Sequence, residues 1–415
     1  MSLRIQYVDP EQHSNRKSEF RLHGKCYLSN FKLCLNMVAN GGNFAVLPGA
    51  YSMIKHIRLM SGGVEIDSCR FANYWMAWKN QNQSNSQNRN IRHKLAQNGV
   101  GFNLNNALYF IDQGSVAQAV PSTAGDNTAG VLSLMEILPI LKEQQVWNTD
   151  LIPHLKIVIE YNDNQLLMKS NSTNAGTISP PILISTEVLD EKAVQESAKV
   201  QGQVWSSIEH DSFVLPAGNP ATGVQKVVQR INGFDNKVVE KFVMMKHLFP
   251  LSKNVNGAIH IGYGPYASEV QHKEELNFIV NSKPVFPRNI KERGEKGMVL
   301  AEAWDRVNIL PYSNQSSIGN NKNGATIQEG QRVGIPFPNN TEADPYPSSK
   351  VGQSDYSGCV LQSRVNQFEV VYQRLPLADT ATPQRQTESL EFKFFALVSK
   401  QVKYQMGQPP IVSYS

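Results

Sequence analysis

Side chains that could do chemistry are few and scattered in this sequence. The nine histidines never fall at the His-Glu-x-x-His or His-x-His spacing that a zinc site requires. His56 and His260 each stand alone in strand-like segments, where a structural histidine is the ordinary interpretation. Glu274 and Glu275 are adjacent acids, and neighbouring side chains of a strand point to opposite faces, so these two alone do not form a glycosidase acid pair. A pair assembled from distant strands stays open.

Phosphate-binding and nucleophile motifs are also missing. Gly262-Tyr-Gly264 resembles the start of a dinucleotide fingerprint, but Pro265 follows at once and no amphipathic helix opens there. The segment Gly352–Gly358 contains no Gly-x-Ser-x-Gly elbow. We therefore predict that the protein is not an enzyme, and we assign no catalytic, cofactor-binding or metal-binding residues.

Charge and cysteine content exclude further classes of protein. Only 18% of residues are charged, and the net charge is +5. The longest basic stretch, Arg89–Lys94, lies in an Asn/Gln/Ser-rich loop rather than in the basic stripe of a nucleic-acid binder. The four cysteines form no Cys-x-x-Cys pair, and Cys26 and Cys34 are expected to be small buried residues. We expect folding in a reducing compartment, with no secretory signal and no membrane span.

One structural unit occurs twice in the chain. A hairpin at Ile54–Asp67 is followed by an aromatic segment at Phe71–Trp78, and a hairpin at Glu275–Phe286 is followed by one at Met298–Leu310. The two turns begin at Gly62 and Asn281, so the offset is 281 − 62 = 219 residues in a chain of 415. A repeat of about half the chain predicts two similar β-domains rather than a solenoid.

The first aromatic segment places four rings on one side of a helix. Phe71, Tyr74, Trp75 and Trp78 fall at positions i, i+3, i+4 and i+7. This spacing predicts a helix that docks on a sandwich wall. The alternative is a stacking platform for single-stranded nucleic acid.

Hydrophobic alternation with a period of two dominates the rest of the chain and yields roughly sixteen candidate strands. We predict an all-β fold of two tandem eight-stranded jelly-roll sandwiches, a double jelly roll, with long loops and a few short helices. The N-terminal sandwich is expected over residues 1–192, with residues 1–18 as an extended arm, and the C-terminal sandwich over residues 193–415. The charged, helix-prone segment Asp190–Val200 is the expected connector, and Val131–Leu138 reads as a short helix.

Several of these segments together resemble a known family. The resemblance is carried by Met53–Ile66 with Asn73 and Tyr74, by Leu276–Pro287, and by the closing stretches Phe368–Tyr372 and Phe394–Tyr414. They are similar to the hairpins and closing strands of double jelly-roll major capsid proteins of polinton-like viruses, virophages and related eukaryotic large DNA viruses. The loops at 80–130 and 312–358 match no part of that pattern.

The resemblance implies a structural viral protein of the virion. Three chains would form a homotrimer with a pseudo-hexagonal outline, and many such capsomers would tile an icosahedral shell around double-stranded DNA, assembled inside the infected host cell. The implied partners are other copies of the chain, penton proteins, and minor capsid or cement proteins. An N-terminal arm with Arg4, Arg16 and Lys17 could face an internal membrane or the genome.

A second hypothesis from the residues is a β-sandwich protein that binds or acts on carbohydrate. It requires exposed aromatic platforms, for which Trp75 and Trp78 are the candidates. Burial of these two side chains would favour core packing, and exposure would favour sugar binding.

Overall fold

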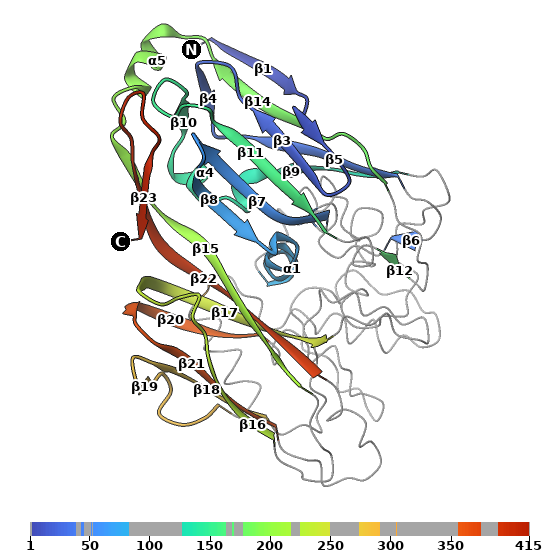
Figure 1. Cartoon of the computed structure of the whole chain (residues 1–415), viewed down its shortest axis with the longest axis vertical. Coiled ribbons are helices and arrows are strands. Elements are labelled where there is room, and N and C mark those ends of the chain that lie inside the picture. Colours follow the sequence, from blue (N-terminus) through green and yellow to red (C-terminus); the bar gives the residue numbers. More distant parts are fainter. Residues whose placement is uncertain are drawn as a thin grey trace, which may run out of the picture.

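The computed structural model describes residues 2–38, 43–44, 51, 53–82, 127–162, 168–169, 177–216, 225–249, 274–290, 304, 356–374 and 389–414. Over these residues the chain is mainly β-strand. Figure 1 shows an upper group of strands that holds the N-terminus and a lower group that holds β16, β18 and β21. The long strands β15 and β22 run between the two groups.

The first half of the chain carries the strands of the upper group and the described helices. The strands are β1 Leu3–Val8, β2 Gln12–His13, β3 Lys17–Arg21, β4 Cys26–Leu28, β5 Lys32–Val38, β6 Asn43–Phe44, β7 Ile54–Ser61, β8 Val64–Arg70, β9 Asn127–Ser133, β10 Val146–Asn148, β11 Lys156–Tyr161, β12 Met168–Lys169, β13 Thr177–Ile178 and β14 Ile182–Val188. The helices are α1 Ala72–Asn82, the 3-10 turn η2 Leu134–Glu136, α4 Ile140–Glu143 and α5 Glu191–Ser197.

The second half carries the strands of the lower group and the long strands. They are β15 Gly202–Leu215, β16 Gln225–Arg230, β17 Lys237–Phe249, β18 Glu274–Val280, β19 Lys283–Pro284, β20 Tyr356–Val365, β21 Phe368–Arg374, β22 Ser389–Lys403 and β23 Ile411–Tyr414.

Both predicted hairpins are present, and both turn residues of each hairpin have a positive φ angle. Gly62 and Gly63 join β7 to β8 with φ angles of 53° and 88°. Asn281 and Ser282 join β18 to β19 with φ angles of 52° and 64°. Two consecutive positive φ angles give the turn twist that matches a two-residue hairpin. The hairpin part of the sequence repeat is therefore also a repeat of structure.

Four larger sheets hold most of the described strands in two matching pairs, and β6 and β12 form a separate two-stranded sheet. We call sheet 1 the sheet that contains β1-β14-β5-β9, and sheet 2 the one that runs β2-β3-β11-β7-β8. Sheet 3 contains β15-β22-β17-β20, and sheet 4 runs β16-β21-β18-β19. The two halves match strand by strand, because corresponding strands occur in the same order along each half of the chain. In sheet order, β1-β14-β5-β9 of sheet 1 corresponds to β15-β22-β17-β20 of sheet 3, and β3-β11-β7-β8 of sheet 2 corresponds to β16-β21-β18-β19 of sheet 4. Over the described residues these sheets hold seven, five, five and four strands, so eight strands in each sandwich stays a prediction.

Period-two burial places a core inside each pair of sheets. Ile57 and Leu59 of β7 are fully buried in the first core, and Phe278 of β18 is fully buried in the second. On β22, Phe392 and Phe394 face the second core, whereas Phe395 belongs to the first. Sheet 3 is therefore covered on both faces, by sheet 4 on one side and by the first half of the chain on the other.

The N-terminal segment differs from the prediction of an arm over residues 1–18. Strand β1 pairs with β14 along its whole length, from Leu3 opposite Val188 to Val8 opposite Leu183. Arg4 forms an ion pair with Glu187. The segment is extended, but the backbone bonds of the ladder hold it in sheet 1.

Two local predictions need correction or a narrower statement. The segment Val131–Leu138 is not one helix, because its first residues complete β9 beside β5 and only Leu134–Glu136 form a 3-10 turn. The connector is a helix as expected, and Asp190 caps it by accepting bonds from the backbone N–H groups of Lys192 and Ala193. The domain boundary at 192 and 193 stays a prediction. The segment 258–263 and most of the segments 80–130, 298–310 and 312–358 lie outside the described residues.

Candidate functional site: the junction between the two halves

The residues examined for chemistry do not converge on a reactive centre in the described part of the chain. No group of three or more His, Cys, Asp or Glu there could hold a metal ion. His56 lies on β7 with Glu160 3.9 Å away, and burial lowers the pKa of its imidazole. Glu275 lies on β18 and accepts a hydrogen bond of 3.1 Å from Asn289. His260 and Gly262–Gly264 lie outside the described residues.

The four cysteines are free thiols, and burial raises the pKa of each. Cys26 is buried as expected, whereas Cys34 is only half-buried. The described part of the chain has no helix that is both long and apolar enough to cross a membrane.

The aromatic face of α1 belongs to the junction between the two halves. Trp75 is 4% exposed and Trp78 is fully buried. The ring of Trp75 lies 5.8 Å from both Trp304 and Phe395, and Trp78 lies 4.7 Å from Trp304. Trp304 donates a hydrogen bond of 3.1 Å to the carbonyl of Phe242 on β17. The sequence prediction of core packing for Trp75 and Trp78 is confirmed, and neither residue offers a sugar-binding platform.

A buried lysine of sheet 3 faces the start of α1. The side chain of Lys393 is only 3% exposed and pairs with Glu391 at 2.6 Å. Its ammonium group also lies 4.2 Å from the ring centre of Phe71 and 4.8 Å from that of Tyr74. Burial lowers the pKa of Lys393, and Glu391 opposes that shift. Because rings attract cations most strongly away from water, this contact ties the first half to β22.

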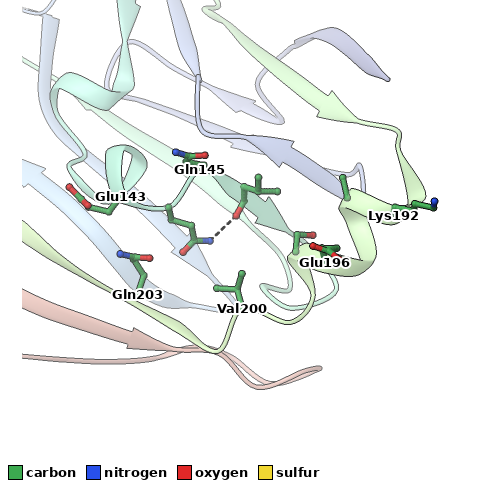
Figure 2. Close-up of a pocket in the computed structure, with 10 residues that line it drawn as sticks. Glu143, Gln145, Lys192, Glu196, Val200 and Gln203 are labelled. Atoms are coloured by element: carbon green, nitrogen blue, oxygen red, sulfur yellow. Dashed lines mark hydrogen bonds between the residues drawn. The ribbon is translucent and has the colours of Figure 1, made fainter. Parts of the chain in front are cut away.

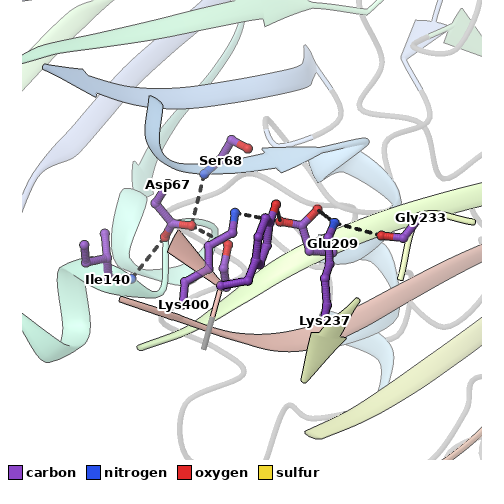
Figure 3. Close-up of polar contacts among 9 residues, drawn as sticks. Asp67, Ser68, Ile140, Glu209, Gly233, Lys237 and Lys400 are labelled. Carbon is purple, nitrogen blue, oxygen red and sulfur yellow. Dashed lines mark hydrogen bonds and ion pairs between the residues drawn. The ribbon is translucent and has the colours of Figure 1, made fainter. Parts of the chain in front are cut away.

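A second lysine-rich cluster lies within sheet 3. Glu209 on β15 accepts ion pairs from Lys400 at 2.6 Å and from Lys237 at 3.1 Å (Figure 3). The hydroxyl of Tyr414 donates to Glu209 at 3.1 Å, and its ring lies 4.6 Å from Lys237 and 5.0 Å from Lys400. Tyr414 of the C-terminal strand β23 thus covers the charged groups of β15, β17 and β22.

Asp67 of β8 joins the first half to this cluster. Its carboxylate is fully buried and accepts hydrogen bonds from the hydroxyl of Ser207 at 2.7 Å and from the backbone N–H of Ile140 at 3.1 Å (Figure 3). Burial raises the pKa of Asp67, and Lys400 opposes that shift. Burial works against ionisation of Glu209 too, but Lys400 and Lys237 outweigh it and hold its pKa below the ordinary value.

Sequence reasoning missed this network entirely. Asp67, Ser207 and Lys400 are far apart in the chain, and no local pattern brings them together, although Asp67 ends the first hairpin. The network performs no chemistry on a substrate that the geometry reveals. What it does is fix the first half against sheet 3 through charges and hydrogen bonds that are satisfied only in one arrangement.

A recess of about 520 Å³ lies beside the connector helix and is walled by both halves. Lys192 and Glu196 of α5, Gln145 beside β10, and Val200 and Gln203 at the start of the second half surround it (Figure 2). Gln144 closes its inner side by donating to the carbonyl of Val146 at 3.1 Å and by accepting a bond of 2.6 Å from the hydroxyl of Tyr404. This amide therefore bridges to the second half rather than pointing at a ligand.

The whole arrangement of sheets is similar to that of solved viral structures. PBCV-1 VP54, as fitted into a reconstruction of the virophage Sputnik, matches 100% of this chain and 97% of its own, with 11% identity and a TM-score of 0.62. The chain has a double jelly-roll fold. This double jelly roll also matches the Faustovirus major capsid protein over 97% of this chain and 90% of that one, with 7% identity and a TM-score of 0.54.

The mavirus major capsid protein gives a third match, over 99% of this chain and 90% of that one, with 11% identity and a TM-score of 0.51. No protein-family model and no curated protein sequence matches this double jelly roll. The likeness therefore lies in the fold.

Proposed function

We propose that this protein is a major capsid protein that trimerises into pseudo-hexagonal capsomers of an icosahedral viral shell. The observation that carries the proposal is the full-length match of the fold to viral major capsid proteins. The matching sheet orders support it, because two equivalent sandwiches in each of three chains give six similar units around a ring. Its place would be the virion, after assembly inside the host cell.

The buried junction is the kind of structure that a shell tile requires. A capsomer transmits load between neighbours, so its two sandwiches must keep one relative position. The ring contact of Trp75 with Phe395 and the hydrogen bond of Ser207 to the buried Asp67 hold sheet 3 against the first half. The role we propose is structural and non-enzymatic.

We propose that the main partners are other copies of the chain, and that penton and minor capsid or cement proteins complete the shell. Arg4 and Lys17 form ion pairs with Glu187 and Glu19 of the chain itself. We therefore do not extend the proposal to contact of the N-terminal residues with a membrane or the genome. We keep the division into residues 1–192 and 193–415, with eight strands each, as part of the proposal.

The first experiment is the mass of the purified chain by light scattering, followed by negative-stain imaging of the same fraction. We expect three times 46.3 kDa and a hexagonal outline. Ile57→Asp places a charge in the first core, where Ile57 is fully buried, and should abolish soluble trimer. A wild-type monomer at all concentrations tested would contradict the proposal.

A further inference from the structure

The junction inside the chain provides a template for a contact between chains. Sheet 3 has one face on the second core and the other face against the first half. On that other face, Ile208 is 4% exposed and Phe395 is fully buried. The covering elements include α1 and β8, since Trp75 packs on Phe395 and β8 lies against both β15 and β23.

Sheet 1 corresponds to sheet 3 in strand order. Its outer face corresponds to the covered face of sheet 3, yet part of it is exposed to solvent. Val8 and Leu183 pack on the first core, so the alternate residues of their strands point to the opposite face. Those residues are large and apolar: Leu3 is 48% exposed, Ile5 64%, Tyr7 72% and Ile182 37%. An exposed row of apolar side chains on a sheet face marks an interaction surface.

The β18–β19 hairpin, which would cover this face, is also exposed and lies at the other end of the molecule. Strand β8, which contacts the counterpart face in the chain, corresponds to β19. The tip of the β18–β19 hairpin, from Asn281 to Pro284, is exposed. Asn281 anchors the tip by accepting bonds from the backbone N–H groups of Asn366 and Gln367 at 2.7 and 3.2 Å. In Figure 1, β1 and the β18–β19 hairpin lie in the upper and lower groups of strands.

We propose that the outer face of sheet 1, formed by Leu3, Ile5, Tyr7 and Ile182, binds the second half of another copy of this chain on the side that carries the β18–β19 hairpin. This contact would repeat between copies the one that sheet 3 makes with the first half inside the chain. It rests on the proposed function, and it names which surfaces form the capsomer.

The occupant follows from the repeat and from the size of the contact. Inside the chain, the outer face of sheet 3 contacts β8. The outer face of sheet 1 and the β18–β19 hairpin stay exposed, so every chain carries both surfaces of a second contact of the same kind. A stable interface covers roughly 800 Å² on each partner, which a folded domain supplies more readily than a single added strand. Because the two surfaces differ, the contact is head-to-tail and can close into a ring. Pairing of sheet 1 with itself would instead give a two-fold dimer.

Two surface variants test the contact from its two sides. Ile5→Asp/Tyr7→Asp changes the face of sheet 1, and Lys283→Glu/Pro284→Asp changes the hairpin tip. All four positions are exposed, so both variants should fold with the wild-type Tm. Met406→Asp is the matched control, because Met406 is 70% exposed but belongs to neither surface. Masses are measured by light scattering for each variant alone and for an equimolar mixture of the two double variants.

We expect each double variant alone to run at 46.3 kDa, with association weakened by roughly 100-fold or more, while Met406→Asp keeps the wild-type mass. The mixture should give twice 46.3 kDa, because each variant retains the surface that the other has lost. Wild-type mass for Ile5→Asp/Tyr7→Asp would overturn the contact. Wild-type mass for the hairpin variant alone would also overturn it and would indicate that sheet 1 pairs with itself. A wild-type chain that stays monomeric would overturn the capsomer proposal and this contact together.

Discussion

Charged residues at the junction are costly to bury and are stable only as a group. The side chains of Glu209, Lys400 and Lys237 are 18%, 7% and 16% exposed, and Glu209 is shared between the two lysines. Removal of one partner from such a pair leaves a charge without compensation away from water. The cost of a substitution here should therefore exceed that of an exposed ion pair by several kcal/mol.

Glu209→Gln should lower the free energy of unfolding by about 3–5 kcal/mol at pH 7, because Lys400 loses its counter-charge. Lys400→Met in the same chain should recover part of the loss. Urea denaturation measures both. The exposed pair Glu196–Lys199, with side chains 78% and 76% exposed, is the control, and Glu196→Gln should cost less than about 1 kcal/mol. Equal effects of Glu196→Gln and Glu209→Gln would contradict the assigned role of burial.

The same variant should change how stability depends on pH. The pKa of Glu209 in the folded chain lies below its ordinary value of 4.5, so its contribution is present above that pH and is lost as the pH falls through the folded pKa. The difference between wild type and Glu209→Gln should therefore shrink on acidification below about pH 4.5. A difference that stays constant down to acid unfolding would mean that Glu209 carries no excess charge stabilisation.

Hairpin turns are the elements whose conformation depends most directly on the local residue types. Ser282 has a φ of 64°, a conformation that costs a residue with a side chain about 1 kcal/mol relative to glycine. Ser282→Gly should therefore stabilise the chain by roughly 0.5–1 kcal/mol, measured by thermal or urea unfolding. Gly63→Ala is the reciprocal change: its φ is 88° and no atom lies within 4 Å of the added methyl group. It should destabilise by about 1 kcal/mol through backbone conformation alone, and no loss for Gly63→Ala would refute this account.

The burial of the tryptophans, including Trp75 and Trp78 of α1, can be tested by fluorescence quenching. The chain has five tryptophans, and their side chains are between 0% and 4% exposed. Iodide should therefore quench the native protein weakly and quench the urea-unfolded protein strongly. Trp78→Ala should cost about 3–5 kcal/mol, because a large fully buried ring is removed from the junction. Strong quenching of the native protein would mean that tryptophan side chains are exposed, and it would favour the carbohydrate hypothesis for Trp75 and Trp78.

Elements were predictable from the sequence where short-range chemistry determines them. Gly62 and Gly63 supply positive φ angles, and the alternation in β7 and β22 places apolar side chains on one face. The short apolar run Val131–Leu138 fits both a helix and a buried strand, so its pattern alone does not separate β9 from a helix. The alternation of Leu3, Ile5 and Tyr7 is a strand signal for β1, although the polar composition of residues 1–18 predicts an arm.

The junction, in contrast, could not be derived from local patterns. Asp67 is a polar residue at the end of a hairpin, and only the packing of sheet 3 against β8 brings Ser207 to its carboxylate. The helical spacing of Trp75 and Trp78 indicated that they are buried, but it did not say against which half. Contacts between residues more than a hundred positions apart depend on topology, which a single sequence expresses only through its repeat.

At the scale of the whole molecule, the first half and sheet 3 share one core, so they should unfold as a single cooperative unit. The C-terminal strand reinforces this unit at its edge. Strand β23 pairs with β22 from Lys400 opposite Tyr414 to Lys403 opposite Ile411, and it also packs on β8. It therefore touches both halves and shields Lys237 and Lys400 from water.

Removal of residues 411–415 should weaken the coupling between the halves more than it weakens either sandwich. We expect urea unfolding to change from one transition to two, because Glu209 and its lysines become solvated while both cores keep their sheets. Tyr414→Phe is the matched control: it removes only the hydrogen bond to Glu209 and should cost about 0.5–1.5 kcal/mol within a single transition. Unfolding followed by circular dichroism and by tryptophan fluorescence should then give different midpoints for the truncated chain and coincident midpoints for Tyr414→Phe. Coincident midpoints for the truncated chain at the wild-type urea concentration would mean that the aromatic contacts of α1 alone hold the two sandwiches together.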